Sequence, residues 1–311
     1  MTREERIAKI RGGRWIRYPL ADRIGAKLEE LLLLPKTHRM PNLLIVGETN
    51  NGKTAMLSRF VRQHPPQEGN GEVASGIPVI AMEAPPVPDE RRFYAEILRQ
   101  VFAPFRASKS AGQLQYEVLR LLSTVEVKLL IIDEIQHVLA GPLLKQRQFL
   151  NVIKHLGNEL QIPIVAAGTQ DAFNAIQTDP QLANRFEPLV LRRWTMGEDY
   201  LRLLASFEVA LPLEHRSGLV EPALALNILS LSEGTIGEIS ALLCRAAVEG
   251  DRARNRTDHR HLSRALRVRR ALPTAACRHW GILRLRGCFW GCARYRERSL
   301  NGTGIVDGSD R

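Results

Sequence analysis

The sequence predicts an α/β fold with a parallel sheet, followed by a small all-helical domain. Between residues 42 and 191, short apolar runs typical of buried strands alternate with amphipathic helical segments. This alternation is the pattern of parallel strands joined by helical crossovers. After Trp194 the apolar residues follow helical periodicity alone, which indicates that the sheet has ended.

The N-terminal region is expected to be a helical extension over residues 4–34. Leucines recur in it at helical spacing, at positions 28, 31 and 32, and Pro35 ends the pattern. The expected strands are residues 42–46, 77–82, 128–132, 163–167 and 187–191. The expected helices between them are residues 54–62, 89–101, 112–122 and 142–160. Four more helices are expected afterwards, over residues 198–211, 221–231, 236–249 and 258–268.

These elements divide the chain into four predicted regions. The regions are a helical extension (1–38), an α/β domain (39–194), a helical lid domain (195–268) and a disordered, atypical tail (269–311).

The composition excludes several classes of protein. Apolar residues make up 44% and charged residues 25%, as in globular proteins. No apolar run approaches the ~18 residues that cross a bilayer. The first 17 residues mix Arg with Glu and contain no hydrophobic segment, so no secretory signal is expected. Four Cys are too few for a disulfide scaffold and fit a reducing cytoplasm. We therefore expect a cytoplasmic protein without a membrane anchor.

The net charge of +11 is unevenly distributed. Residues 1–60 carry 12 Lys+Arg and 6 Asp+Glu, residues 61–250 carry 17 and 22, and residues 251–311 carry 15 and 5. The three net charges are +6, −5 and +10. A basic chain of this kind favours a polyanionic partner such as nucleic acid.

A phosphate-binding loop follows the first expected strand. Residues 47–54, GETNNGKT, fit the pattern G-x-x-x-x-G-K-[ST], in which the glycines let backbone N–H groups face phosphates at a helix N-terminus. Lys53 is expected to reach the β- and γ-phosphates, and the Thr54 hydroxyl to coordinate Mg²⁺. The predicted nucleotide-binding residues are Gly47, Glu48, Thr49, Asn50, Asn51, Gly52, Lys53 and Thr54.

Two acids end the third expected strand. Because ligands of open parallel sheets bind beyond the carboxyl ends of the strands, Asp133 and Glu134 are expected to face the nucleotide. Asp133 can hold Mg²⁺ through water, and Glu134 can polarise the attacking water. The alternative for Glu134 is a helix cap. Together with the loop, the pair predicts ATP binding and hydrolysis.

These residues resemble the AAA+ ATPases, and among them the transposition-accessory ATPases of the TniB/TnsC group, over about residues 10–268. The segments that carry the resemblance are residues 39–47, 49–54, 131–137, 147–151, 182–188 and 233–237. The resemblance implies a homo-oligomeric ring or filament that assembles with ATP on double-stranded DNA and directs a partner transposase of the DDE type.

The resemblance also implies roles for single residues. Thr169 matches the first sensor position near the γ-phosphate, and Arg185 matches the arginine finger that one subunit offers to the ATP of its neighbour. A surface Arg is the alternative for Arg185. Two positions depart from relatives: Glu238 stands where many AAA+ lids place an Arg, which implies slow, regulatory turnover, and His137 follows Gln136 after the acids. We expect His137 to support the structure there.

The DNA-facing surface of relatives comes from segments that correspond here to residues 85–92 and 105–110. Arg106 and Lys109 suit contacts with phosphates, which would give backbone tracking rather than base reading. A solvated loop with two charges is the alternative.

The tail, residues 269–311, matches nothing in the family. Residues 251–311 contain 15 Arg and no Lys, as in a GC-rich coding sequence read in a shifted frame. A basic DNA-binding arm is one alternative. A zinc site is another, with Cys277, His279, Cys288 and Cys292 as its ligands. We expect a disordered, non-native tail.

Two other functions remain open on sequence. One is an assembly or motor ATPase of a secretion or signalling complex, without a DNA role. The other is a replication-initiator or helicase-loader ATPase, which would predict a winged-helix domain after the lid.

Overall fold

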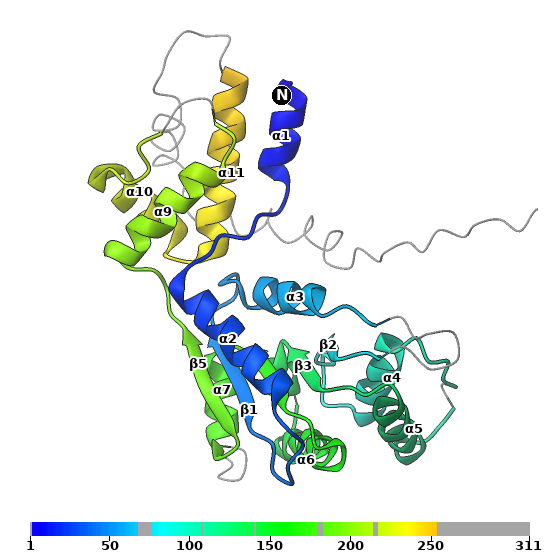
Figure 1. Cartoon of the computed structure of the whole chain (residues 1–311). Helices are drawn as coiled ribbons and strands as arrows, with labels where there is room; N and C mark the ends of the chain where they lie inside the picture. The colour runs from blue at the N-terminus through cyan, green and yellow to red at the C-terminus, as the bar shows by residue number, and fades with distance from the viewer. Residues whose placement is uncertain are drawn as a thin grey trace, which may run out of the picture. The chain divides into compact units, whose positions relative to one another are not determined.

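A five-stranded sheet lies at the centre of the protein. The computed structural model describes residues 2–67, 76–106, 108–139, 141–178, 183–213 and 217–253. The strands are β1 (Asn42–Gly47), β2 (Val79–Glu83), β3 (Leu129–Asp133), β4 (Ile164–Gly168) and β5 (Phe186–Leu191). Their order is β2-β3-β4-β1-β5, and every neighbouring pair is parallel (Figure 1). All five expected strands are present.

Helices cover both faces of the sheet. They are α2 (Pro19–Leu33), α3 (Lys53–Gln63), α4 (Glu90–Gln100), α5 (Ala111–Thr124), α6 (Leu143–Leu160), α7 (Gln170–Gln177) and the 3-10 helix η1 (Ile135–Leu139). Leu43 and Ile45 of β1 join the core beneath α2 and α3. Leu44 and Val46 point the opposite way, into the core beneath α4, α5, α6 and α7. The sheet with helices on both faces forms a three-layer sandwich, which confirms the predicted α/β fold with a parallel sheet.

The helical part consists of α1 (Arg3–Arg11), α9 (Glu198–Ala210), α10 (Pro222–Ser232) and α11 (Ile236–Ala253). The expected N-terminal helical extension consists of two helices, α1 and α2. Its first helix ends at Arg11 with Gly12 as the C-cap, and α2 begins at Pro19, whose fixed φ suits the first position of a helix. α1 packs against α11, so the two ends of the described chain meet.

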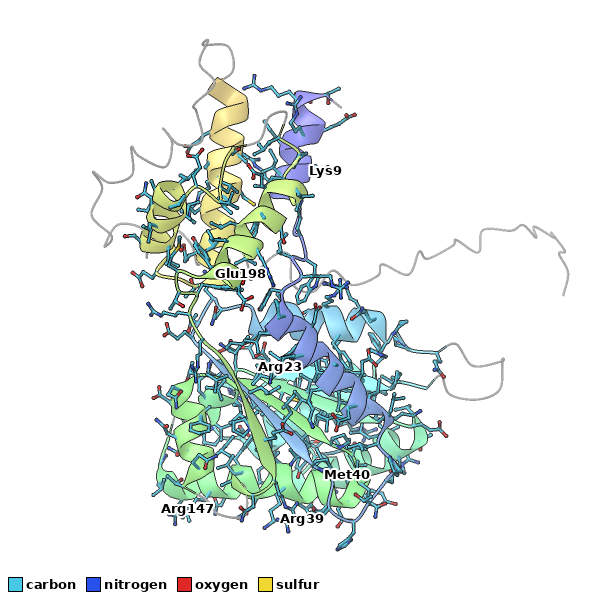
Figure 2. All side chains as sticks on the ribbon, turned by 60° about the vertical axis from the view of Figure 1, so that its left-hand side comes forward. Lys9, Arg23, Arg39, Met40, Arg147 and Glu198 are labelled. Atoms are coloured by element: carbon cyan, nitrogen blue, oxygen red, sulfur yellow. The ribbon has the colours of Figure 1, made fainter. Side chains whose placement is uncertain are left out.

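Charged side chains mark the surface of the described residues. Those labelled in Figure 2, among them Arg23 on α2 and Arg147 on α6, are exposed. The predictions for residues 258–268 and 269–311, including the zinc alternative, lie outside the part of the chain that the structure describes.

Candidate nucleotide-binding site

The phosphate-binding loop begins where the buried strand β1 ends. Gly47 lies so close to β5 that a Cβ there would be 2.9 Å from the Cβ of Leu191. Gly52 has a φ of +87° and Asn50 a φ of +62°, left-handed conformations that glycine and asparagine accept most readily. Helix α3 begins at Lys53. The loop therefore lies at a helix N-terminus, where backbone N–H groups favour anions.

Lys53 is buried inside this loop, with 4% of its surface exposed. Its Nζ donates hydrogen bonds to the carbonyl oxygens of Gly47 at 2.8 Å and Glu48 at 2.9 Å. Burial lowers the pKa of Lys53, and the nearby carboxylates of Glu134, Asp133 and Glu48 oppose that shift. Because an ammonium group is costly to bury, this position favours an anionic ligand.

The second part of the site lies at the carboxyl end of β3. The Thr54 hydroxyl donates a hydrogen bond of 2.6 Å to Asp133 Oδ2, across 79 positions of sequence. Burial raises the pKa of the Asp133 carboxyl group, and the hydrogen bonds from Thr54 and from the Glu134 backbone lower it. Glu134 itself adopts a φ of +53°, and its N–H lies 2.9 Å from Asp133 Oδ1. The fold thus brings the two predicted halves of the site together.

Thr169 follows β4, the strand between β3 and β1. Its hydroxyl is buried and has no hydrogen-bond partner within the described residues. Its backbone N–H donates to Gln136 Oε1 at 3.2 Å, and Gln136 Nε2 donates in turn to the Glu134 carboxylate. Since buried hydroxyls are rarely left without a partner, the Thr169 hydroxyl is an unusual group, whose hydrogen-bonding capacity the described residues do not satisfy.

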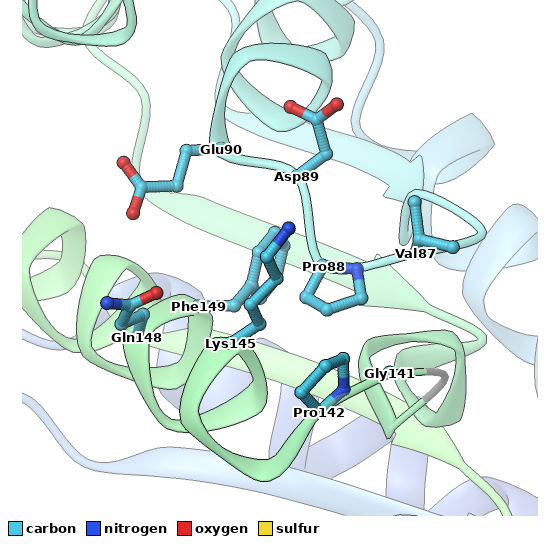
Figure 3. A pocket seen from close by; sticks show the side chains of 9 residues that line it. All are labelled: Val87, Pro88, Asp89, Glu90, Gly141, Pro142, Lys145, Gln148 and Phe149. Atoms are coloured by element: carbon cyan, nitrogen blue, oxygen red, sulfur yellow. The ribbon is translucent and has the colours of Figure 1, made fainter.

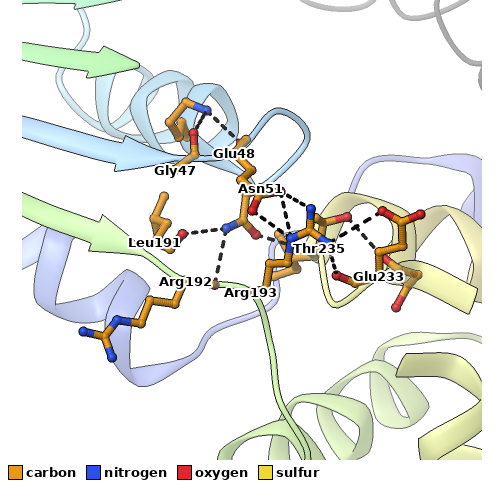
Figure 4. Close-up of polar contacts among 11 residues, drawn as sticks. Gly47, Glu48, Asn51, Leu191, Arg192, Arg193, Glu233 and Thr235 are labelled. Carbon is orange, nitrogen blue, oxygen red and sulfur yellow. Dashed lines mark hydrogen bonds and ion pairs between the residues drawn. The ribbon is translucent and has the colours of Figure 1, made fainter. Parts of the chain in front are cut away.

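The start of α11 rests on the tip of the loop. The Gly237 N–H donates to the carbonyl oxygen of Asn50 at 3.0 Å, and Asn50 Nδ2 donates to Glu238 Oε1 at 2.9 Å. Asn51 Nδ2 donates to the Leu191 carbonyl at 2.9 Å (Figure 4). Glu238, at the position where many AAA+ lids have an Arg, therefore binds the loop directly.

A salt bridge adds to this contact. Arg193 Nε lies 2.8 Å from both carboxylate oxygens of Glu48, and Arg193 Nη1 lies 3.3 Å from the Glu233 carbonyl (Figure 4). The hydrogen bond from Arg193 lowers the pKa of Glu48, which burial opposes. The acid of the loop is thus neutralised by a residue that follows β5.

Arg185 lies at the opposite end of the sheet from the loop. It directly precedes β5, and its Nη1 donates to Asn158 Oδ1 at 2.7 Å. β5 runs parallel to β1 along the whole stretch from Asn42 to Gly47. At ~3.3 Å per residue, these ends are about 16 Å apart. Arg185 is therefore not part of the site formed by its own loop.

The predicted DNA-facing residues differ in their surroundings. Arg106 is exposed, whereas the Lys109 ammonium forms an ion pair with Glu117. Residues 87–90 of the segment 85–92 line a pocket of about 480 Å³, together with three residues of α6 and the two residues that precede this helix. Figure 3 shows Lys145 of α6 facing this segment across the pocket.

His137 of η1 faces the end of β2, with Nδ1 3.3 Å from the Ala84 carbonyl and 3.7 Å from Glu83 Oε1.

Among the described residues, no group of three or more His, Cys, Asp or Glu is arranged to hold a metal ion. None of the described helices is long and apolar enough to cross a membrane.

Two residues of the site were not assigned a role from the sequence. Gln136 and Arg193 lie just beyond the carboxyl ends of β3 and β5, respectively. Position at these strand ends, where open parallel sheets bind ligands, is the signal that could have identified them.

The fold and the site define the class: this is an AAA+ P-loop protein of the NTP-binding type. The Aeropyrum pernix ORC1 protein, solved in complex with DNA, superimposes with a TM-score of 0.53 at 20% identity, over 83% of this chain and 69% of that chain. The ORC2 protein of the same organism, solved as ADPNP–ADP complexes, superimposes with a TM-score of 0.59 at 16% identity, over 83% of this chain and 71% of that chain. Cdc6p from Pyrobaculum aerophilum superimposes with a TM-score of 0.56 at 14% identity, over 86% of this chain and 74% of that chain. At these identities the likeness shows the fold alone.

The family is established separately. The model of the family described as bacterial TniB protein matches residues 6–196. The chain therefore belongs to the TniB family, as the resemblance predicted. No curated protein matches it.

Proposed function

We propose that this protein is an ATPase that assembles with ATP on double-stranded DNA and directs or activates a partner transposase of the DDE type. Membership of the TniB family supports the transposition role. The observation that carries the enzymatic part is the convergence of Lys53, the Thr54–Asp133 pair, Glu134 and the Thr169 hydroxyl around one loop. We propose that the protein carries out this role in the cytoplasm.

Magnesium fits the site by the chemistry of its donors. Thr54 and Asp133 offer a hydroxyl and a carboxylate oxygen 2.6 Å apart. Mg²⁺ prefers oxygen ligands, which it usually takes from one or two protein side chains together with phosphates and water. These two residues would hold the ion. When bound, Mg²⁺ supplies positive charge that neutralises phosphate oxygens during transfer.

Each residue has a separate task in the proposed hydrolysis. The loop from Gly47 to Gly52 binds phosphates through its N–H groups, and Lys53 neutralises their charge. Glu134 orients and polarises the attacking water. The Thr169 hydroxyl has no partner among the described residues, so it is free to donate a hydrogen bond to the γ-phosphate or to that water.

The position of Arg185 supports the proposed self-association. Because about 16 Å of sheet separate it from its own loop, it can serve as an arginine finger only for the nucleotide of a neighbouring copy. The Asn158 amide already orients its guanidinium at 2.7 Å. ATP held between two copies would then join them, which supports a homo-oligomeric ring or filament.

The proposed contacts with DNA are made by Arg106 and Lys109. Arg106 is exposed and available to phosphates, while Lys109 would have to exchange Glu117 for a phosphate. Assembly aligns many copies of these residues along one duplex, so weak contacts add up. Binding should tolerate any sequence, because phosphates carry no sequence information.

Sedimentation of the full chain with double-stranded DNA tests the proposal. ATP should increase DNA binding at least about tenfold over the nucleotide-free protein, and the Lys53→Ala variant should lose this increase. The salt dependence should be steep, since each neutralised phosphate contributes ~0.9 to the log–log slope. Arg106→Ala should flatten the slope, and Arg23→Ala, a change of another exposed arginine, should not. Equal DNA binding with and without ATP would contradict the proposal.

A further inference from the structure

Gln136 connects two residues of the proposed catalytic centre. Its Nε2 donates a hydrogen bond to Glu134 Oε2, and its Oε1 accepts one from the Thr169 N–H at 3.2 Å. Both the NH₂ group and the carbonyl oxygen of the amide are therefore hydrogen-bonded. Within the described residues, no other side chain forms a hydrogen bond with the Glu134 carboxylate.

The orientation of this amide follows from its partners. A backbone N–H can only donate, so the atom facing Thr169 must be the carbonyl oxygen. A carboxylate can only accept, so the atom facing Glu134 must be the NH₂ group. The alternative orientation of the amide would place donor against donor and acceptor against acceptor.

Close packing holds Gln136 in place. A Cβ added at Gly168 would lie 2.9 Å from Gln136 Oε1 and 2.7 Å from Ile135 Cγ2. A side chain in place of Gly168, which ends β4, would therefore collide with the Gln136 amide. Because the Thr169 N–H is hydrogen-bonded to Gln136 Oε1, a shift of Thr169 would strain or move this amide.

We propose that Gln136 is a positioning residue, which orients the Glu134 carboxylate for hydrolysis and couples its orientation to Thr169. This inference rests on the proposed role of Glu134. The hydrogen bond from Gln136 Nε2 to Glu134 Oε2 restrains the carboxylate and leaves Glu134 Oε1 for the attacking water. Glu134 needs this restraint because a glutamate side chain has three rotatable bonds.

Substitution of Gln136 by methionine tests the inference. Gln136→Met keeps the length of the side chain and removes both hydrogen bonds. We expect kcat for ATP to fall about 10- to 100-fold, the effect of misplacing a catalytic group. The dissociation constant for ATP, measured by equilibrium dialysis, should be unchanged, since Gln136 does not belong to the phosphate-binding loop.

Two further variants separate positioning from a general structural role. Gln136→Glu keeps the acceptor for Thr169 but places an oxygen against Glu134, so its kcat should be as low as that of Gln136→Met. Gln170→Met is the matched control, because Gln170 is a nearby glutamine whose Nε2 contacts only Asn174 among the described residues. It should retain wild-type kcat. In a Glu134→Gln background, Gln136→Met should lower the residual rate no further.

The outcomes distinguish this inference from the function on which it rests. Wild-type kcat in both Gln136 variants, with Glu134→Gln inactive, would overturn the inference and leave the proposed ATPase intact. Wild-type kcat in Glu134→Gln itself would remove Glu134 from its role and overturn both. A low kcat in the Gln136 variants together with unchanged ATP affinity supports the inference.

Discussion

Glu48 and Arg193 show how a single residue pair adjusts the charge of the site. A carboxylate inside a phosphate-binding loop would repel a nucleotide, but Arg193 Nε lies 2.8 Å from both of its oxygens. Both side chains are about half exposed, so solvent screens the pair and its effect on stability is small. The affinity of the loop for a nucleotide is therefore a more sensitive measure of the pair than the stability of the protein.

Removing Arg193 should therefore weaken nucleotide binding. In Arg193→Ala the loop keeps an unpaired negative charge, and we expect the dissociation constant for ATP to rise about threefold at low ionic strength. Glu48→Gln should bind ATP at least as tightly as the wild type. The double variant should return to the wild-type value, because it restores the charge balance. An affinity loss in Glu48→Gln as large as that in Arg193→Ala would mean that the pair acts through geometry rather than charge.

The same pair predicts a pH dependence. The hydrogen bond from Arg193 holds the pKa of Glu48 below its usual value. The stability that the pair contributes is therefore present above the ordinary pKa of Glu and is lost as the pH falls through the lowered value. The difference in melting temperature between wild type and Arg193→Ala should be constant near neutral pH and should shrink in acid. A difference that grows on acidification would contradict this assignment.

At the residue scale, sequence predicts contacts within one motif, and between the loop and the acids that end the third strand, but not between residues that no motif or strand-end rule connects. The residues from Gly47 to Thr54 form one continuous motif, so their proximity follows from the chain itself. Arg193 contacts Glu48 across 145 positions, and no spacing rule connects the two. Gln136 stands beside the predicted acids, but its role depends on Thr169, which only the sheet brings near.

At the element scale, the contact between α11 and the loop depends on one glycine. A Cβ at Gly237 would lie 2.0 Å from Asn50 Oδ1 and 2.5 Å from the Asn50 carbonyl oxygen. No side chain fits that gap, so the close approach of the helix to the loop requires glycine here.

Gly237→Ala should therefore destabilise the protein by about 1–3 kcal/mol, the usual cost of overpacking. Gly250→Ala is the matched control in the same helix, because a Cβ at Gly250 meets nothing within 4 Å. It should stabilise by about 0.5–1 kcal/mol, since alanine is the better helix former. Urea unfolding of both variants measures the difference. Equal shifts in the two variants would show that α11 does not hold the loop in this way.

The elements that sequence predicted share a strong signal. The strands β1 and β3 are continuous apolar runs, buried over nearly their whole length, and α4 and α6 carry clear apolar faces. The 3-10 helix η1 was missed because it spans only five residues. Helix α7 spans eight and was also missed. The break between α1 and α2 comes from Gly12 and Pro19, which interrupt an otherwise helical composition.

At the scale of the whole molecule, the strand order was the part that sequence could not supply. Apolar runs predict that strands exist, but not that β1 lies between β4 and β5. That order decides which residues share a site. It places Thr169 and the acids after β3 beside the loop, and it leaves Arg185 at the far end of the sheet.

The separation of Arg185 from its own loop leads to a test of shared sites. The Arg185→Ala variant keeps its loop and Glu134 but cannot complete the site of its neighbour. The Glu134→Gln variant is expected to bind ATP without hydrolysing it, while still offering Arg185. Each variant alone should have little ATPase activity.

Mixing the two should restore activity, because an Arg185→Ala copy can receive the finger of a Glu134→Gln neighbour. In a random head-to-tail assembly at equal ratio, roughly a quarter of the interfaces combine the intact halves. We therefore expect about a quarter of the wild-type ATPase activity, measured at saturating ATP on DNA, and co-sedimentation of the two variants must be verified in the same samples. Lys53→Ala mixed with Glu134→Gln is the control that should stay inactive, because no interface then contains both Lys53 and Glu134 in one copy. If the variants co-assemble and no activity returns at any ratio, each site is complete within one chain and Arg185 is not a finger.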